Sequence, residues 1–145
     1  MSRRKGRILA FHALYSFDLV KTPLNELLTL NWAGEGRESP EEEKVEKDDE
    51  TSDFARMMIN GTVSNLDEID SYIKKYMSEK WTIERINKVA LAVLRISIYT
   101  LLFQKDISPS IVIDEAISIA RDFGAEDSYK FINAVLDKIS KEISS

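Results

Sequence analysis

The sequence has no cysteine, a single histidine and only five glycines among its 145 residues. Without cysteine it cannot form a disulfide, a thiolate metal site, an iron–sulfur cluster or a cysteine nucleophile. The single histidine, His12, excludes a metal site built from two histidines on one helix. The glycines form no phosphate-binding loop. We therefore predict that the chain is not an enzyme and holds no metal or cofactor.

The net charge of −5 is concentrated in one segment. Residues 35–53 contain ten acidic and three basic residues, a local charge of −7, which leaves +2 for the rest of the chain. This segment has glycine and proline but almost no apolar residues, so we predict a flexible acidic loop over about residues 33–52. At the other extreme, four bases lie among the first seven residues: Arg3, Arg4, Lys5 and Arg7.

No segment of the sequence is typical of a membrane span or a secretion signal. The most apolar stretch, residues 89–103, contains Arg95 and is too short to cross a bilayer. The apolar run after the N-terminal bases is interrupted by His12 and Asp18, and no small-residue cleavage site follows. We expect a soluble, cytoplasmic protein.

Apolar residues recur at helical spacing along almost the whole chain, and strand and hairpin signals are missing. We predict an all-α fold, a single domain over residues 1–145 built as a bundle of about seven helices. Residues 89–94 are apolar on every side, which is typical of a central helix. His12 lies in the first predicted helix, and we predict a structural role for it. The expected boundaries are a cap at Thr22 followed by Pro23, a capping box of Asn65 and Glu68, a cap at Thr82, Ser108 followed by Pro109, and a stop at Gly124.

The basic N-terminus leads directly into the first predicted helix, so Arg3, Arg4 and Arg7 can share one face. Aromatic residues, among them Tyr15, follow on the same helix. Cations beside aromatic rings suit single-stranded RNA, whose phosphates are neutralised while unstacked bases lie on the rings. The alternative is a solvated basic run followed by aromatic residues that belong to the core.

A second candidate surface lies at residues 124–131. Asp127 and Phe131 are four residues apart and therefore share a helix face, with Lys130 beside them. Phe131 is offset from the main apolar stripe of its helix, which favours partial exposure. The alternative is an ordinary turn between helices with a packed aromatic ring.

Several ordered motifs resemble the NusB family of transcription antitermination factors. The resemblance covers nearly the whole chain except roughly residues 33–52. The motifs are Ala13-Leu14-Tyr15 after the arginine-rich start, Val93-Leu94-Arg95-Ile96 with Tyr99, Asp114-Glu115-Ala116-Ile117, the segment Phe123–Ser128 and the closing segment Lys130–Lys138.

This resemblance implies an all-α RNA-binding protein that partners a small-subunit ribosomal protein, called NusE in this role. The pair would bind the boxA element of nascent ribosomal RNA transcripts and join RNA polymerase with other Nus factors to suppress premature termination. By the same resemblance, Arg3, Arg4, Lys5 and Arg7 contact RNA phosphates, Lys130 and Phe131 contact RNA, Tyr15 serves both RNA and partner, and Asp127 serves the partner.

One departure from the family pattern concerns Ala90 and Leu91, where relatives commonly carry an acid and a base facing NusE. The resemblance therefore implies a more apolar or differently oriented partner contact at this point. The sequence also leaves open a protein–protein adaptor without RNA binding, an RNA-modifying enzyme and a homodimer formed through the basic face. The charge of the acidic loop suggests a further hypothesis, that it folds over the basic tip and competes with RNA.

Overall fold

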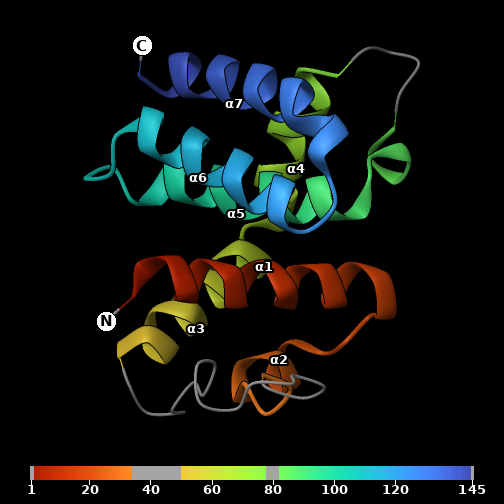
Figure 1. The fold of residues 1–145 in the computed structure, drawn as a ribbon, viewed down its shortest axis with the longest axis vertical. Coiled ribbons are helices and arrows are strands. Elements are labelled where there is room, and N and C mark those ends of the chain that lie inside the picture. Colours follow the sequence, from red (N-terminus) through yellow and green to blue (C-terminus); the bar gives the residue numbers. More distant parts are fainter. Residues whose placement is uncertain (1, 34–49, 78–81, 145) are drawn as a thin grey trace.

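The computed structural model describes residues 2–33, 50–77 and 82–144, and these ranges contain helices and turns without any strand (Figure 1). The prediction of an all-α bundle is confirmed. The α-helices are α1 (Arg3–Val20), α2 (Leu24–Thr29), α3 (Glu50–Ser64), α4 (Leu66–Lys75), α5 (Lys88–Phe103), α6 (Pro109–Asp122) and α7 (Tyr129–Ser144), with short 3₁₀ turns η1 (Ile83–Arg85) and η2 (Glu126–Ser128).

Helix α5 is the centre of the bundle, as its apolar sequence predicts. Every residue from Ala90 to Leu101 is buried, and the helix contacts α1, α3, α4, α6 and α7. Figure 1 shows α5 behind α6, between α1 on one side and α7 on the other. A helix surrounded in this way must be apolar around its whole circumference.

The other helices pack around α5, with α4 against α5 and α3. Helix α1 packs on α3 and α5, and α2 packs on α3. Helix α6 packs on α5 and α7, and the chain turns between them at Gly124, whose φ of 92° favours glycine. Within the described ranges, the helices lack the combination of length and hydropathy that a membrane span requires.

Two predicted helix caps are wrong: Thr82 does not cap α5, and Asn65 does not form a capping box. Helix α5 is capped by Asn87, whose Oδ1 accepts hydrogen bonds from the amides of Val89 at 2.9 Å and Ala90 at 3.2 Å. Thr82 precedes only η1 and makes no side-chain cap there. Asn65 donates its side-chain amide to the carbonyl of Gly61 at 2.8 Å, so it does not form the expected capping box.

The start of α2 also differs from its prediction. Pro23 occupies the cap position instead of the first helical position, and it offers no side-chain hydrogen bond. The hydroxyl of Thr22 pairs instead with that of Ser16, at 2.6 Å between the oxygens. Pro109 does begin α6 as expected, although Ser108 makes no side-chain cap.

The predicted acidic loop, about residues 33–52, lies mostly outside the described residues, and its expected end overlaps the start of a helix. Helix α3 already begins at Glu50, and Thr51 and Ser52 are buried. Acidic side chains in the first turn of a helix interact favourably with its dipole, and both Glu50 and Asp53 lie there. Two acids of the acidic segment 35–53 therefore lie in the first turn of a helix.

Candidate nucleic-acid interface

The four N-terminal bases form the first turns of α1, and we call this set, Arg3, Arg4, Lys5 and Arg7, the basic arm. Ser2 caps the helix by accepting a hydrogen bond from the amide of Lys5 at 3.2 Å. Its own amide donates to Thr51 Oγ1 at 3.0 Å, which ties the start of α1 to the start of α3. Cations at a helix N-terminus are disfavoured by the dipole, so other groups must compensate for this arrangement.

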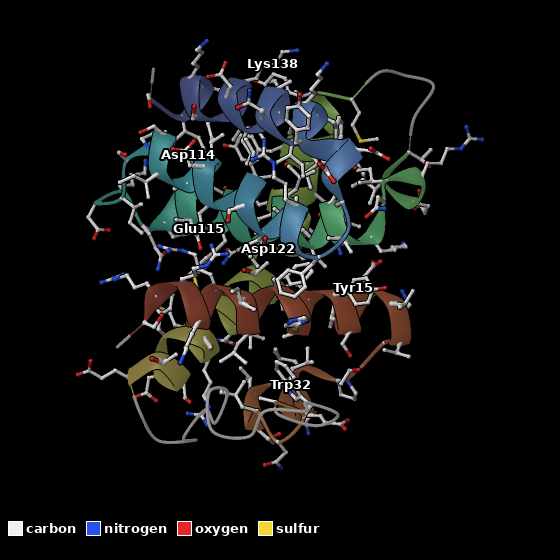
Figure 2. All side chains as sticks on the ribbon, in the orientation of Figure 1. Tyr15, Trp32, Asp114, Glu115, Asp122 and Lys138 are labelled. Carbon is white, nitrogen blue, oxygen red and sulfur yellow. The ribbon has the colours of Figure 1, made fainter. Side chains whose placement is uncertain are left out.

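Arg4 is compensated by two acids of α6. Its guanidinium contacts Glu115 at 3.0 Å and Asp122 at 2.8 Å. Figure 2 shows both carboxylates on the side of α6 that faces α1. Arg4 is thus paired within the protein. The next residue, Lys5, lies on the surface.

Arg3 and Arg7 instead lie against the ring of Phe54 on α3. Their guanidinium carbons are 5.3 Å and 5.7 Å from the ring centroid, within the range of cation–π attraction. Burial lowers the pKa of Arg7, the charge of Glu115 opposes this effect, and the charge of Arg3 adds to it. The arm is therefore a structured group of cations, and not a loose basic tail.

The second predicted surface forms one wall of a cavity of about 530 Å³. The structure brings Asp127 and Phe131 together there, as their spacing predicts, although Asp127 lies in η2 and not in α7. Lys130 is exposed, with its Nζ 6.0 Å from the ring centroid of Tyr129. The cavity is lined by Tyr76, Met77, Arg85, Ile86, Asn87, Asp127, Ser128 and Phe131.

Tyr15 lies far along α1 from the basic arm (Figure 2). Eleven residues separate it from Arg4, which corresponds to about 16 Å along the helix axis. Its side chain is half-buried, with its ring 6.4 Å from that of Phe11. The structure therefore divides the predicted site residues into the arm, Tyr15, and the cavity wall with Lys130 next to it in sequence.

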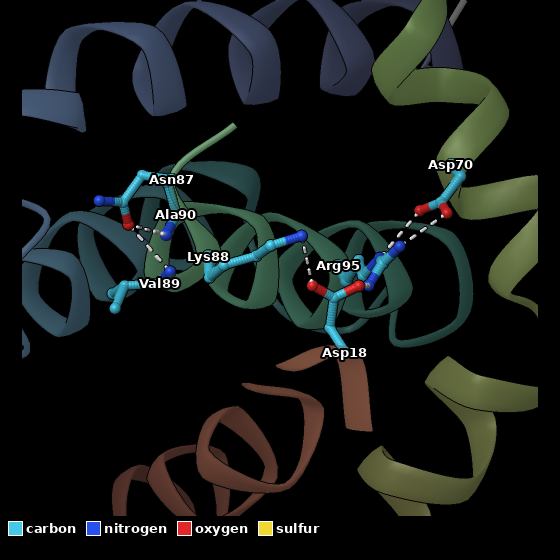
Figure 3. A network of polar contacts seen from close by, with 7 residues as sticks. All are labelled: Asp18, Asp70, Asn87, Lys88, Val89, Ala90 and Arg95. Atoms are coloured by element: carbon cyan, nitrogen blue, oxygen red, sulfur yellow. Dashed lines mark hydrogen bonds and ion pairs between the residues drawn. The ribbon is translucent and has the colours of Figure 1, made fainter. Parts of the chain in front are cut away.

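A buried polar network fixes the end of α1 near Tyr15 (Figure 3). Arg95 on α5 makes two contacts with Asp70 on α4, at 3.0 Å and 2.9 Å, and one with Asp18 on α1 at 3.3 Å. Lys88 adds an ion pair to Asp18 at 2.8 Å. The side chain of Arg95 is 6% exposed, so its charge depends on these partners.

This network sets the protonation of Asp18. Burial alone raises the pKa of Asp18, but the hydrogen bond from Lys88 and the charge of Arg95 hold it below its ordinary value. Lys88 directly follows Asn87, which lines the cavity. The network thus joins the far end of α1 to the helix start beside the cavity wall.

The expectation of a modified partner surface at Ala90 and Leu91 is wrong. The two residues are 0% and 1% exposed, so they belong to the core around α5 and cannot contact a partner directly.

His12 is half-buried between two aromatic rings, as expected of a structural histidine. The centroid of its ring lies 5.0 Å from that of Phe11 and 4.9 Å from that of Phe123.

The fold and these surfaces define an all-helical binding protein with a cationic helix start and an aromatic-lined cavity. The sequence profile of the NusB family matches residues 4–141. This chain belongs to the NusB family, and it is a transcription antitermination factor and not an enzyme.

Individual relatives agree with this assignment. The transcription antitermination protein NusB of Treponema denticola is 46% identical over 142 residues, which cover 98% of each chain. That of Geobacter sp. (strain M21) is 39% identical over 143 residues, covering 99% of this chain and 97% of the relative.

Solved structures show the same fold. The structure of T. maritima NusB matches with a TM-score of 0.80 and 38% identity, covering 98% of this chain and 92% of that one. A chain from the crystal structure of antitermination factors NusB and NusE in complex with dsRNA matches with a TM-score of 0.78 and 28% identity, covering 97% of this chain and 96% of that one.

Proposed function

We propose that this protein acts in the cytoplasm with NusE to bind the boxA element of nascent ribosomal RNA transcripts. The bound pair joins RNA polymerase and other Nus factors and suppresses premature termination. The observation that carries the proposal is the basic arm, four cations gathered at the one end of α1 where the helix dipole disfavours them. The similar chain solved with NusE and dsRNA supports the two partners.

The separate surfaces divide the work of binding. The basic arm neutralises phosphates, which supplies affinity without sequence preference. Phe131 at the cavity wall stacks an unpaired base while Lys130 contacts the adjacent backbone. Tyr15 and Asp127 serve the contact with NusE, and Tyr15 also faces the RNA. Binding of boxA RNA against a scrambled RNA of equal length, with and without NusE, tests this division.

Replacing Phe131 by alanine is expected to weaken binding of boxA RNA by roughly 5- to 150-fold, because one base–aromatic stack contributes about 1–3 kcal/mol. Phe103→Ala is the matched control, since this ring is 50% exposed at the end of α5 and does not line the cavity. Fluorescence anisotropy measures affinity, and thermal unfolding checks that both variants fold. Equal affinities for the two folded variants would remove Phe131 from the RNA site.

Neutralising the partners of Arg4 is expected to strengthen RNA binding. The double variant Glu115→Gln, Asp122→Asn releases the guanidinium from two ion pairs. Ion pairs near the protein surface contribute about 0–1 kcal/mol each, so we expect a gain of about three- to tenfold. Affinity is measured at low salt, where the competition is strongest.

The control for this variant keeps the net charge equal. Asp106→Asn with Asp114→Asn also removes two acidic charges; both residues are exposed, and neither forms an ion pair with Arg4. Figure 2 shows Asp114 on α6 close to Glu115, so the control tests position as well as charge. An equal gain in both double variants would mean that only net charge matters.

A further inference from the structure

Phe54 is an aromatic residue of α3 that lies under the basic arm. Its side chain is 7% exposed, so it belongs mainly to the core. The guanidinium groups of Arg3 and Arg7 nevertheless both lie within 6 Å of its ring centroid. One ring therefore holds two cations from successive turns of α1.

This arrangement depends on Gly6, which lies between the two arginines in sequence. A Cβ atom at this position would come within 2.5 Å of Phe54 Cδ1 and 3.3 Å of Cε1, which is too close without a shift of the ring. Glycine inside a helix is less stable than alanine, so its presence needs a reason. The approach of the Phe54 ring to the helix backbone supplies that reason.

The ring cannot easily adapt by a movement of its helix. The amide of Ser2 donates to Thr51 Oγ1 at 3.0 Å, which joins the starts of α1 and α3. The carbonyl oxygen of Thr51 also lies 3.4 Å from the position of a Cβ at residue 6. The spacing between the two helix starts is therefore constrained by this hydrogen bond and by the close approach of the Thr51 carbonyl to Gly6.

Two like charges over one ring form a site that favours an anion. Arg3 is exposed and Arg7 is half-buried. Burial lowers the pKa of Arg7, and the positive charge of Arg3 lowers it further. The nearby acid is Glu115, whose Oε1 is already bound by Arg4. A phosphodiester carries a negative charge and several acceptor oxygens, so it would reduce the repulsion between the guanidinium groups.

We infer that Phe54 is a positioning residue for RNA: its ring holds the guanidinium groups of Arg3 and Arg7 together so that they bind the phosphodiester backbone, and Gly6 lets the ring reach them. This inference rests on the proposed RNA-binding function and adds two residues to it. Neither Phe54 nor Gly6 carries charge, so their effect on RNA acts entirely through the arginines.

The test compares Phe54→Leu with Phe54→Tyr, using boxA RNA over a range of salt concentrations. Leucine keeps an apolar side chain and every charge of the protein but removes the ring face. We expect Phe54→Leu to lose about three- to tenfold in affinity. The slope of log affinity against log salt should become shallower by about 0.7 for each phosphate contact that is lost. Phe54→Tyr keeps a ring and is expected to retain the affinity and the salt dependence.

Gly6→Ala provides an independent test, because alanine favours helix formation in α1 more than glycine does. We expect it to displace the ring and lower RNA affinity as Phe54→Leu does, with helical content retained by circular dichroism. If both folded variants bind RNA like the parent protein while Arg3→Glu with Arg4→Glu loses affinity, the positioning role is overturned and the RNA function stands. If the arginine variant also binds normally, the proposed role of the arm itself is overturned. Should Phe54→Leu unfold, Gly6→Ala decides the outcome.

Discussion

Charge reversal at Arg3 and Arg4 is expected to weaken binding of boxA RNA by about 10- to 100-fold at low salt. Each phosphate contact with a single strand contributes about 0.7 to the slope of log affinity against log salt, so four arm contacts would supply about 3 and the double variant should lose at least about 1.4. The affinity is measured by anisotropy at several salt concentrations.

The structure predicts that the two substitutions are unequal. Arg4 is paired with Glu115 and Asp122 in the free protein, so RNA must displace these acids. Arg3 is exposed over the ring of Phe54, and no acid within the described part of the chain forms an ion pair with it. Arg3→Glu alone is therefore expected to account for most of the loss in affinity.

A charge-matched control distinguishes the arm from the total charge of the protein. Lys105→Glu with Lys138→Glu changes two exposed lysines outside the arm, and Figure 2 shows Lys138 on α7, away from α1. The control should lose much less affinity and keep most of its salt dependence. A similar loss in both variants, or an unchanged slope in the arm variant, contradicts the assigned role of the arm.

Replacing Arg95 by alanine is expected to lower the free energy of unfolding by about 3 kcal/mol. This is the lower end of the range of about 3–5 kcal/mol that is typical of breaking a buried ion pair. The loss is large because Asp70 is left without its two guanidinium contacts and Asp18 keeps only Lys88. It falls near the lower end because the two aspartates are 17% and 16% exposed and regain some water. Urea unfolding followed by circular dichroism measures this change.

The control for Arg95 removes the whole charge group. The triple variant Asp18→Asn, Asp70→Asn, Arg95→Met has no buried carboxylate that lacks its guanidinium partner. It should therefore be more stable than Arg95→Ala. A single variant as stable as the parent protein would show that the network contributes nothing to folding. A triple variant no more stable than Arg95→Ala would show that packing, and not charge, explains the loss.

The architecture was predictable because its strongest signals are local. Residues 89–94 are apolar on every side, and the structure places them at the centre of the bundle. That same apolar character already indicated burial for Ala90 and Leu91, and the resemblance to relatives with charges there misled the surface prediction. The helix caps were less predictable, because Asn87 and Thr82 both offer suitable oxygens and only the folded backbone selects one.

The candidate site was predictable in its charged residues but not in their partners. The spacing of the basic arm is visible in the first seven residues, whereas Phe54, Glu115 and Asp122 come from distant helices. No local pattern joins residues separated by 47 to 118 positions. Arg95 did carry a usable signal, because an arginine inside a long apolar helix requires buried acidic partners.

The most direct test of the proposed function is a titration of labelled boxA RNA and a scrambled RNA with this protein, alone and with NusE. We predict that the protein alone prefers boxA RNA and that NusE strengthens this preference without improving the binding of scrambled RNA. Equal binding of the two RNAs, or no RNA binding until NusE is added, contradicts the account. The second result would make the protein an adaptor that reaches RNA only through its partner.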